Sequence, residues 1–145
     1  MIRDALLTFS DNQAIAAGNS QNVIDLGPLS GGNTARQIGA GTPLYLALAF
    51  PASLVGTLTV NLQTSDTEGG TYTTVTSTTV APADATSGKK FAVSIPTTGL
   101  KRFLRLSYAG GTAGTIWAGI VQDVGQWTLY HGGYDMEQIT YPVTP

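Results

Sequence analysis

The chain has 145 residues, the usual size of one domain, and its formal net charge of −2 excludes a global basic field that would attract nucleic acid. Charged residues make up only 11% of the chain, against about 25% in ordinary soluble domains. There is no cysteine, which excludes disulfides, thiolate metal sites and cysteine nucleophiles. The remaining polar residues are mostly uncharged, and such a surface suits contact with other protein, because burying a hydroxyl or an amide costs less than burying an ion.

Alternation of apolar and polar residues with a period of two dominates the sequence and indicates half-buried β-strands. In chain order, strands are predicted over residues 5–9, 22–26, 44–50, 57–64, 72–80, 90–95, 102–108 and 115–124. The last of these is apolar on both faces, which predicts a central strand. One short helical turn is expected near residues 33–38. Strands this short, separated by glycine- and proline-containing turns, predict an all-β fold: an eight-stranded, jelly-roll-like antiparallel β-sandwich.

The sequence changes character after Val124, where it becomes aromatic, is broken by glycines and lacks a clear period. We therefore expect residues 1–124 to form the β-sandwich and residues 125–145 to form an extended C-terminal arm. Large aromatic side chains on such a tail typically anchor it to a protein surface, although a sugar-stacking platform is the alternative. The candidate contact residues of the arm are Trp127, Tyr130, His131, Tyr134 and Tyr141. Trp117, inside an apolar strand, is expected in the core.

Residues suited to catalysis are few. His131 is the only histidine, and an extended arm is a poor place to hold a base within hydrogen-bond reach of a nucleophile. Asp25 and Asp123 lie in apolar strands, so a pair of acids that hydrolyses a glycoside stays open as a minor interpretation. The segment 66–70 lacks the full ligand spacing of a calcium loop, and an Asx-type turn is the commoner explanation. We expect no catalytic residues, no metal and no cofactor.

Five of the seven cationic residues fall between positions 89 and 105. These residues are Lys89, Lys90, Lys101, Arg102 and Arg105. One interpretation is a solvated sheet edge, where lysine discourages aberrant strand pairing. The other is a patch that docks on an acidic surface of a partner protein. Nucleic-acid binding is not expected, because aromatic residues are not interleaved with these cations.

Several segments, taken in order, resemble the jelly-roll capsid cement proteins of tailed bacteriophages. They include Asn22-Val-Ile-Asp-Leu26 and Lys101-Arg-Phe-Leu-Arg-Leu-Ser-Tyr108, together with residues 1–11, 38–46, 62–66 and 115–124. The resemblance covers most of residues 1–124 and fades after Val124. It is weaker at Thr42, where an acidic or similar polar residue is expected.

The resemblance implies a homotrimeric decoration protein that binds the major capsid protein at threefold and quasi-threefold joints of an icosahedral shell. It implies no catalytic residues and no cofactor. We expect a protein made in the host cytoplasm and placed on the outer capsid surface of the virion, with no nucleic-acid partner. The first residues do not resemble a signal peptide, and no stretch approaches the ~18 apolar residues of a membrane span, so no membrane association is expected. A carbohydrate-binding jelly-roll module, receptor-binding or accessory, is the alternative function.

Overall fold

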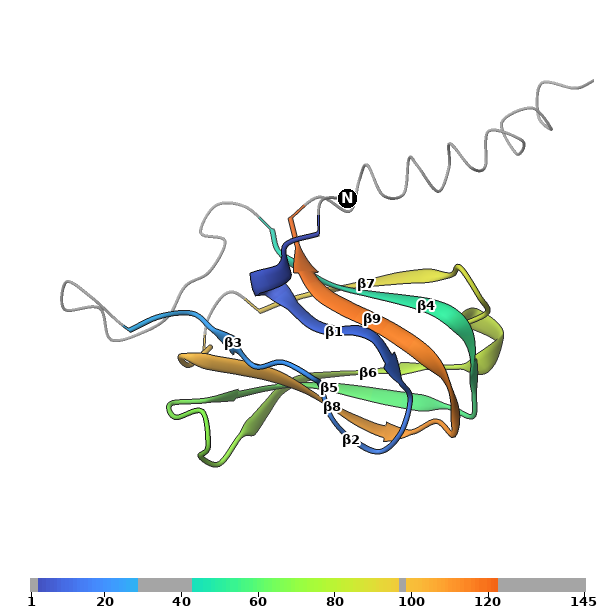
Figure 1. The fold of residues 1–145 in the computed structure, drawn as a ribbon. Helices are drawn as coiled ribbons and strands as arrows, with labels where there is room; N and C mark the ends of the chain where they lie inside the picture. Colours follow the sequence, from blue (N-terminus) through green and yellow to red (C-terminus); the bar gives the residue numbers. More distant parts are fainter. Residues whose placement is uncertain (1–2, 29–42, 97–98, 123–145) are drawn as a thin grey trace, which may run out of the picture.

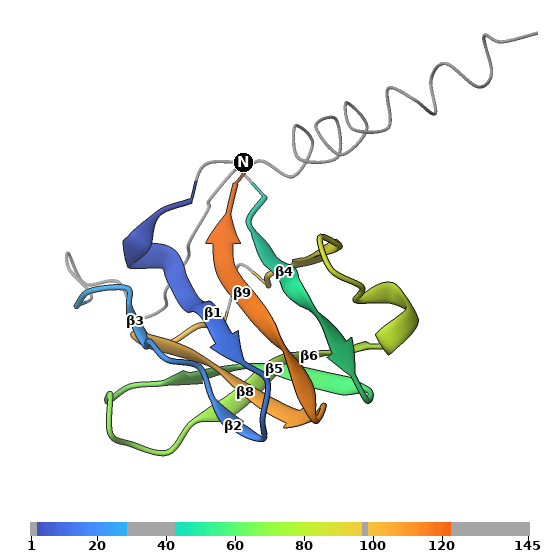
Figure 2. The ribbon, with the colours of Figure 1, turned by 45° about the vertical axis from the view of Figure 1, so that its right-hand side comes forward.

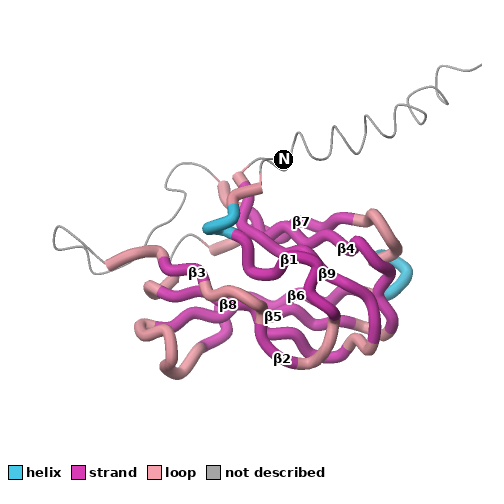
Figure 3. Tube along the Cα trace, in the orientation of Figure 1, coloured by secondary structure: helices cyan, strands magenta, loops and turns pink. Residues whose placement is uncertain are grey.

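The computed structural model describes residues 3–28, 43–96 and 99–122. Within these ranges the chain forms β-strands and two short 3-10 helices, η1 and η2, which lie at different ends of the molecule (Figure 3). In chain order the elements are η1 (Ala5–Leu7), β1 (Thr8–Ala14), β2 (Gly18–Asn19), β3 (Ile24–Asp25), β4 (Tyr45–Val55), β5 (Leu58–Ser65), β6 (Thr73–Val80), η2 (Pro82–Asp84), β7 (Lys90–Ser94), β8 (Phe103–Gly110) and β9 (Ala113–Val121). No helix in this part of the chain is long and apolar enough to cross a membrane.

The strands build two antiparallel sheets that pack face to face (Figures 1 and 2). Sheet A has the order β1-β9-β4-β7, and sheet B has the order β2-β8-β5-β6. The short strands β2 and β3 both pair with β8, at successive positions, so they act as one interrupted strand. The pairs are nested along the chain: β1 pairs with β9, β2 and β3 pair with β8, β4 pairs with β7, and β5 pairs with β6. This is the jelly-roll arrangement, so the predicted all-β antiparallel sandwich is confirmed.

Most strand boundaries follow the predicted ranges, but β1 ends at Ala14, five residues past its predicted end, and three further features differ. Residues 5–7 form η1 instead of a strand, because the Asp4 side chain accepts a hydrogen bond from the Leu6 N–H at 2.8 Å and caps the turn. Strand β4 continues past Pro51 to Val55, and a register shift against β9 at this point accommodates the proline. Strand β2 is only two residues long and was not predicted. The helical turn expected near residues 33–38 and the arm at 125–145 lie outside the described residues.

The hydrophobic core lies between the two sheets and uses the alternation that the sequence predicts. In β5, the buried side chains are Leu58, Val60 and Leu62, each at most 1% exposed. Strand β8 contributes Leu104 and Leu106 from the neighbouring position in sheet B. Sheet A faces them with a set of inward residues: Phe9, Leu46, Leu48, Phe50, Ile116, Ala118 and Ile120. The predicted central position of the last strand is confirmed, since β9 lies between β1 and β4.

A buried polar network connects the sheets beside this core. The Tyr108 hydroxyl lies 2.7 Å from Ser10 Oγ, and Ser10 donates its own proton to Gln13 Oε1 at 2.6 Å. Because serine has one hydroxyl proton, Tyr108 is the donor in the first bond. Gln13 in turn donates to the carbonyl oxygen of Asn19 at 2.9 Å. Burial raises the pKa of Tyr108 to about 12. The network therefore ties β1 of sheet A to β8 and β2 of sheet B.

Candidate interaction surface

The outer face of sheet A carries a small apolar cluster that the protein covers itself. We call it the Trp117 face, made of Tyr45, Ala47, Ala49, Trp117 and Val121. The indole of Trp117 is only 3% exposed, and the guanidinium carbon of Arg3 lies 4.4 Å from its ring centroid. Gly119 makes room for the ring, because a Cβ at that position would lie 2.8 Å from it. Trp117 is thus buried as expected, but in a separate cluster outside the space between the sheets.

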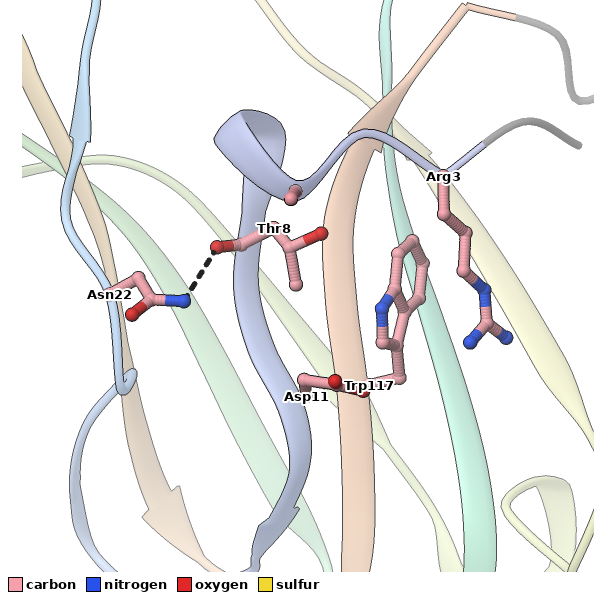
Figure 4. Close-up of a pocket in the computed structure, with 6 residues that line it drawn as sticks. Arg3, Thr8, Asp11, Asn22 and Trp117 are labelled. Carbon is pink, nitrogen blue, oxygen red and sulfur yellow. Dashed lines mark hydrogen bonds between the residues drawn. The ribbon is translucent and has the colours of Figure 1, made fainter.

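A depression of about 310 Å³ opens beside this cluster, at the N-terminal end of β1 (Figure 4). Its lining includes Arg3, Thr8, Asp11, Asn22 and Trp117. Asn22 is fixed there, because its Nδ2 donates to the carbonyl oxygen of Thr8 at 3.1 Å. The depression thus offers a cation, a carboxylate and an amide, a mixture that suits a polar ligand with both donor and acceptor groups.

The five clustered cations of the sequence do not form one patch. Lys89 and Lys90 are exposed at the start of β7, an edge strand of sheet A, whereas the other three lie at or within β8 of sheet B. The chain runs the length of β7, roughly 13 Å, before it crosses towards Lys101. The position of Lys89 and Lys90 at an edge agrees with the interpretation of a protected sheet edge.

Two of the sheet B cations pair with acids on the same chain. Lys101 Nζ lies 2.9 Å from Asp66 Oδ2. Arg102 binds both carboxylate oxygens of Asp25, at 2.7 and 2.8 Å, and this hydrogen bonding raises the pKa of the Arg102 guanidinium. Asp25 is therefore an exposed ion-pair partner on the surface. Asp123, the other acid of the minor enzymatic interpretation, lies outside the described residues.

The third cation, Arg105, is held by uncharged neighbours. Its Nε donates to Gln63 Oε1 at 2.9 Å, and its guanidinium carbon lies 3.9 Å from the centroid of the Tyr72 ring. Burial raises the pKa of the Tyr72 hydroxyl, although the charge of Arg105 opposes that shift. The guanidinium thus lies over the Tyr72 ring at the margin of a larger surface.

The turn over residues 66–70 closes through its own hydrogen bonds. Gly70 donates its backbone N–H to the carbonyl oxygen of Thr67, and the Thr67 N–H donates to Ser65 Oγ. Asp66 pairs with Lys101, as described above. Among the residues that the structure describes, no cluster of three or more acidic or histidine side chains is placed to hold a metal ion.

The broadest candidate surface is the outer face of sheet B, which sequence analysis did not identify. We call it the polar face, made of Asn19, Thr59, Asn61, Ser77, Thr79 and Ser107. One row crosses four strands, because Asn61 lies opposite Ser77 on one side and Ser107 on the other, and Ser107 lies opposite Asn19. Directly opposed residues share a face of an antiparallel sheet, so these side chains form one continuous, uncharged surface. The alternating polar residues were visible in the sequence, but the register that aligns them was not.

The aromatic residues of the predicted arm are not placed by the structure. Trp127, Tyr130, His131, Tyr134 and Tyr141 all lie outside the described residues, so their role as contact residues stays a prediction.

Comparison with known proteins places the chain in a family without describing its activity. No curated protein matches the sequence. A family model described as Bbp16 matches residues 9–124, which span the described sandwich from β1 to the end of β9. Because the match covers most of the chain, this protein belongs to the Bbp16 family.

Proposed function

We propose that this protein is a structural cement of a tailed bacteriophage, which docks on the outside of the assembled capsid and stabilises the shell. The observation that carries this proposal is the polar face, a continuous and uncharged surface across four paired strands of sheet B. A partner can cover such a face at low cost, because hydroxyls and amides exchange water for protein partners more easily than ions do. Membership of the Bbp16 family supports a phage-related protein, and the resemblance of several segments to jelly-roll cement proteins supports the finer assignment.

The proposed mechanism follows from binding several capsid subunits at once. A homotrimer at a threefold or quasi-threefold joint contacts more than one copy of the major capsid protein, so modest individual contacts combine through effective concentration. A protein that binds the assembled lattice, but not the loose subunits, stabilises the assembled state by mass action. The sandwich adds packed β-structure over joints that internal pressure would otherwise open.

The test is decoration of capsids that lack the protein. Purified protein is added to expanded shells, and binding is measured by co-sedimentation and imaged by electron microscopy, where three copies are expected at each joint. Asn61→Lys places a charge at the centre of the polar face and is expected to weaken binding at least tenfold, because the charge must be dehydrated on docking. Thr86→Lys adds the same charge in an exposed loop after η2 and is the matched control.

Each outcome bears on a different part of the proposal. If the wild-type protein fails to bind shells, the cement function is wrong. If Asn61→Lys binds as tightly as Thr86→Lys, the polar face is not the surface that contacts the shell. If images show a number of copies other than three at each joint, the threefold placement is wrong while the cement function stands.

The depression beside Trp117 favours a second candidate function, carbohydrate binding. Arg3, Asp11 and Asn22 line it with groups that can hydrogen-bond to sugar hydroxyls. A glycan array tests this function, with Asp11→Ala as the variant, because the Asp11 side chain is exposed and its removal should not disturb the fold. Binding that the variant abolishes would support a sugar site, and an array without any binding would contradict it.

A further inference from the structure

The described sandwich has four strand edges, and each edge strand presents backbone N–H and C=O groups that another strand could pair with. Strands β1 and β7 form the edges of sheet A, and the interrupted strand β2/β3 and β6 form the edges of sheet B (Figures 1 and 2). Folded proteins protect such edges with charges, irregularities or covering segments, because an open edge recruits other chains.

Three of the four edges carry such protection. The register of β1 shifts twice against β9, and Asn22 covers its outer side by bonding to the backbone oxygens of Phe9 and Thr8. The opposite edge of sheet A, β7, is five residues long, begins with Lys90 and directly follows Lys89. The β2/β3 edge is broken into two pieces of two residues each, too short to template a new strand.

Strand β6 lacks these protections. It runs for eight residues with the sequence Thr-Thr-Val-Thr-Ser-Thr-Thr-Val, without a charge or a proline. It pairs with β5 on one side, and no described segment pairs with its other side. Its one irregularity is a register shift between Leu62 and Gln63 on the partner strand, which leaves Thr76–Val80 regular. This edge is therefore the open one of the described sandwich.

We propose that β6 pairs with β6 of a second copy of this chain, antiparallel and across a twofold axis, so that two copies of sheet B form one continuous sheet. A strand that adds to itself in this way uses the same patch on both subunits. The other three edges are protected, so each subunit offers one usable edge, and pairing through this edge joins two copies and no more. A head-to-tail arrangement would need a second open edge and would grow into a fibre.

The side chains of β6 are complementary to themselves. Every residue of the strand except Val75 and Val80 is a threonine or a serine. A hydroxyl both donates and accepts, and Thr–Thr pairs across antiparallel strands are favourable. In any register that keeps the outer faces of the two sheets on the same side, most opposed residues are hydroxyl residues. No like charges then lie opposite each other, because β6 has no charged residue. The pair would also join the two polar faces, because Ser77 at the edge belongs to the row through Asn61.

This contact goes beyond the proposed function, since a twofold pair does not by itself build a threefold joint. In solution it predicts a mass that corresponds to an even number of copies. The test measures the mass of the full-length protein by analytical ultracentrifugation. Ser77→Lys, at an exposed position in the middle of β6, is expected to halve the mass at the same concentration, because two like charges meet near the twofold axis. The control is Ser107→Lys, the same substitution in the same row of sheet B but on β8, away from the edge.

A charge-swap experiment keeps the test decisive even if one variant folds less well. Ser77→Glu alone should also halve the mass, whereas an equimolar mixture of Ser77→Lys and Ser77→Glu should restore it, because opposite charges then meet. Circular dichroism checks that each variant retains its β-structure. A wild-type mass with an odd number of copies, a Ser77→Lys mass equal to that of Ser107→Lys, or a mixture that stays at half the mass would each overturn the pairing. Decoration of shells by the wild-type protein is a separate readout, so failure of the pairing leaves the cement function intact.

Discussion

The outer faces of the two sheets differ although their strands use the same alternation. On sheet A, the outward positions of β4 and β9 carry apolar and small residues, and the protein buries them with its own indole ring under Arg3. On sheet B, the outward positions of β5 and β6 carry mostly hydroxyls and amides, and β8 adds Ser107 between Arg105 and Ala109. The Trp117 face is thus buried by residues of the same chain, whereas the polar face stays exposed to water or to a partner.

The difference shows that an exposed surface built for assembly need not be apolar. A large exposed apolar patch would favour aggregation before a partner arrives, so it is covered internally. Uncharged polar side chains hydrogen-bond to water in the free protein, and they can bond to protein later without the cost of burying ions. Three measurements follow, in order of decreasing effect: two probe the outer faces, and one probes the interior between the sheets.

The largest effect is expected for Trp117→Ala, which removes the side chain that seals sheet A. Loss of this buried aromatic group should lower the free energy of unfolding by about 3–5 kcal/mol, because the neighbouring alanines cannot fill the space. Asn61→Ala, the corresponding truncation on the polar face, should change it by at most about 0.5 kcal/mol, because that side chain is on the surface. Urea denaturation measures both. A similar loss of unfolding free energy in Trp117→Ala and Asn61→Ala would contradict the view that one face is buried and the other exposed.

The next largest effect is a pH dependence of the free energy of unfolding, which comes from Tyr108 in the core between the two sheets. Tyr108 keeps its proton in the folded state up to about pH 12, whereas an unfolded tyrosine loses it near pH 10. The unfolded state therefore binds fewer protons between these values, and stability falls as the pH rises, by about 2–3 kcal/mol from pH 10 to pH 12. Tyr108→Phe removes this contribution, so the difference in slope between wild type and variant isolates it. If the free energy of unfolding falls with pH at the same slope in wild type and in Tyr108→Phe, Tyr108 is not buried in its neutral form.

The smallest effect of the three is expected for Gly119→Ala, which tests how tightly the Trp117 face is packed. The added methyl group would lie 2.8 Å from the indole ring and 3.1 Å from the carbonyl oxygen of Leu7, so either the ring or η1 must shift. We expect a loss of about 1–3 kcal/mol in the free energy of unfolding. Gly69→Ala, where a Cβ meets nothing within 4 Å, is the control and should be close to neutral. Equal melting temperatures for the two variants would show that the ring is loosely held.

Much of the fold follows from local sequence pattern. Alternation located β5 and β8 within one or two residues, because a half-buried strand imposes its period directly on the sequence. Strand β2 escaped prediction, since two residues are too few to carry a period. The start of β1 was misplaced, because the hydrogen bond from the Leu6 N–H to the Asp4 side chain competes with an extended backbone for residues 5–7.

The candidate surfaces were harder to predict, because they depend on which strands become neighbours. The row through Asn61 joins residues that lie far apart in the sequence, and only the pairing of β5 with β6 and β8 aligns them. The cations near positions 89 and 105 are close in sequence, yet the crossing between β7 and β8 sends them to different sheets. Proximity along the chain was therefore a poor guide to a shared patch in this topology.

The nested pairing of strands also constrains how the molecule forms. Strand β1 finds its partner only in β9, about a hundred residues later, and the same long separation applies to β2 and β8. Such strands pair only after distant parts of the chain have been brought together, and this requirement slows folding to roughly milliseconds to seconds. During synthesis the N-terminal strand must wait, unpaired, until nearly the whole sandwich has left the ribosome.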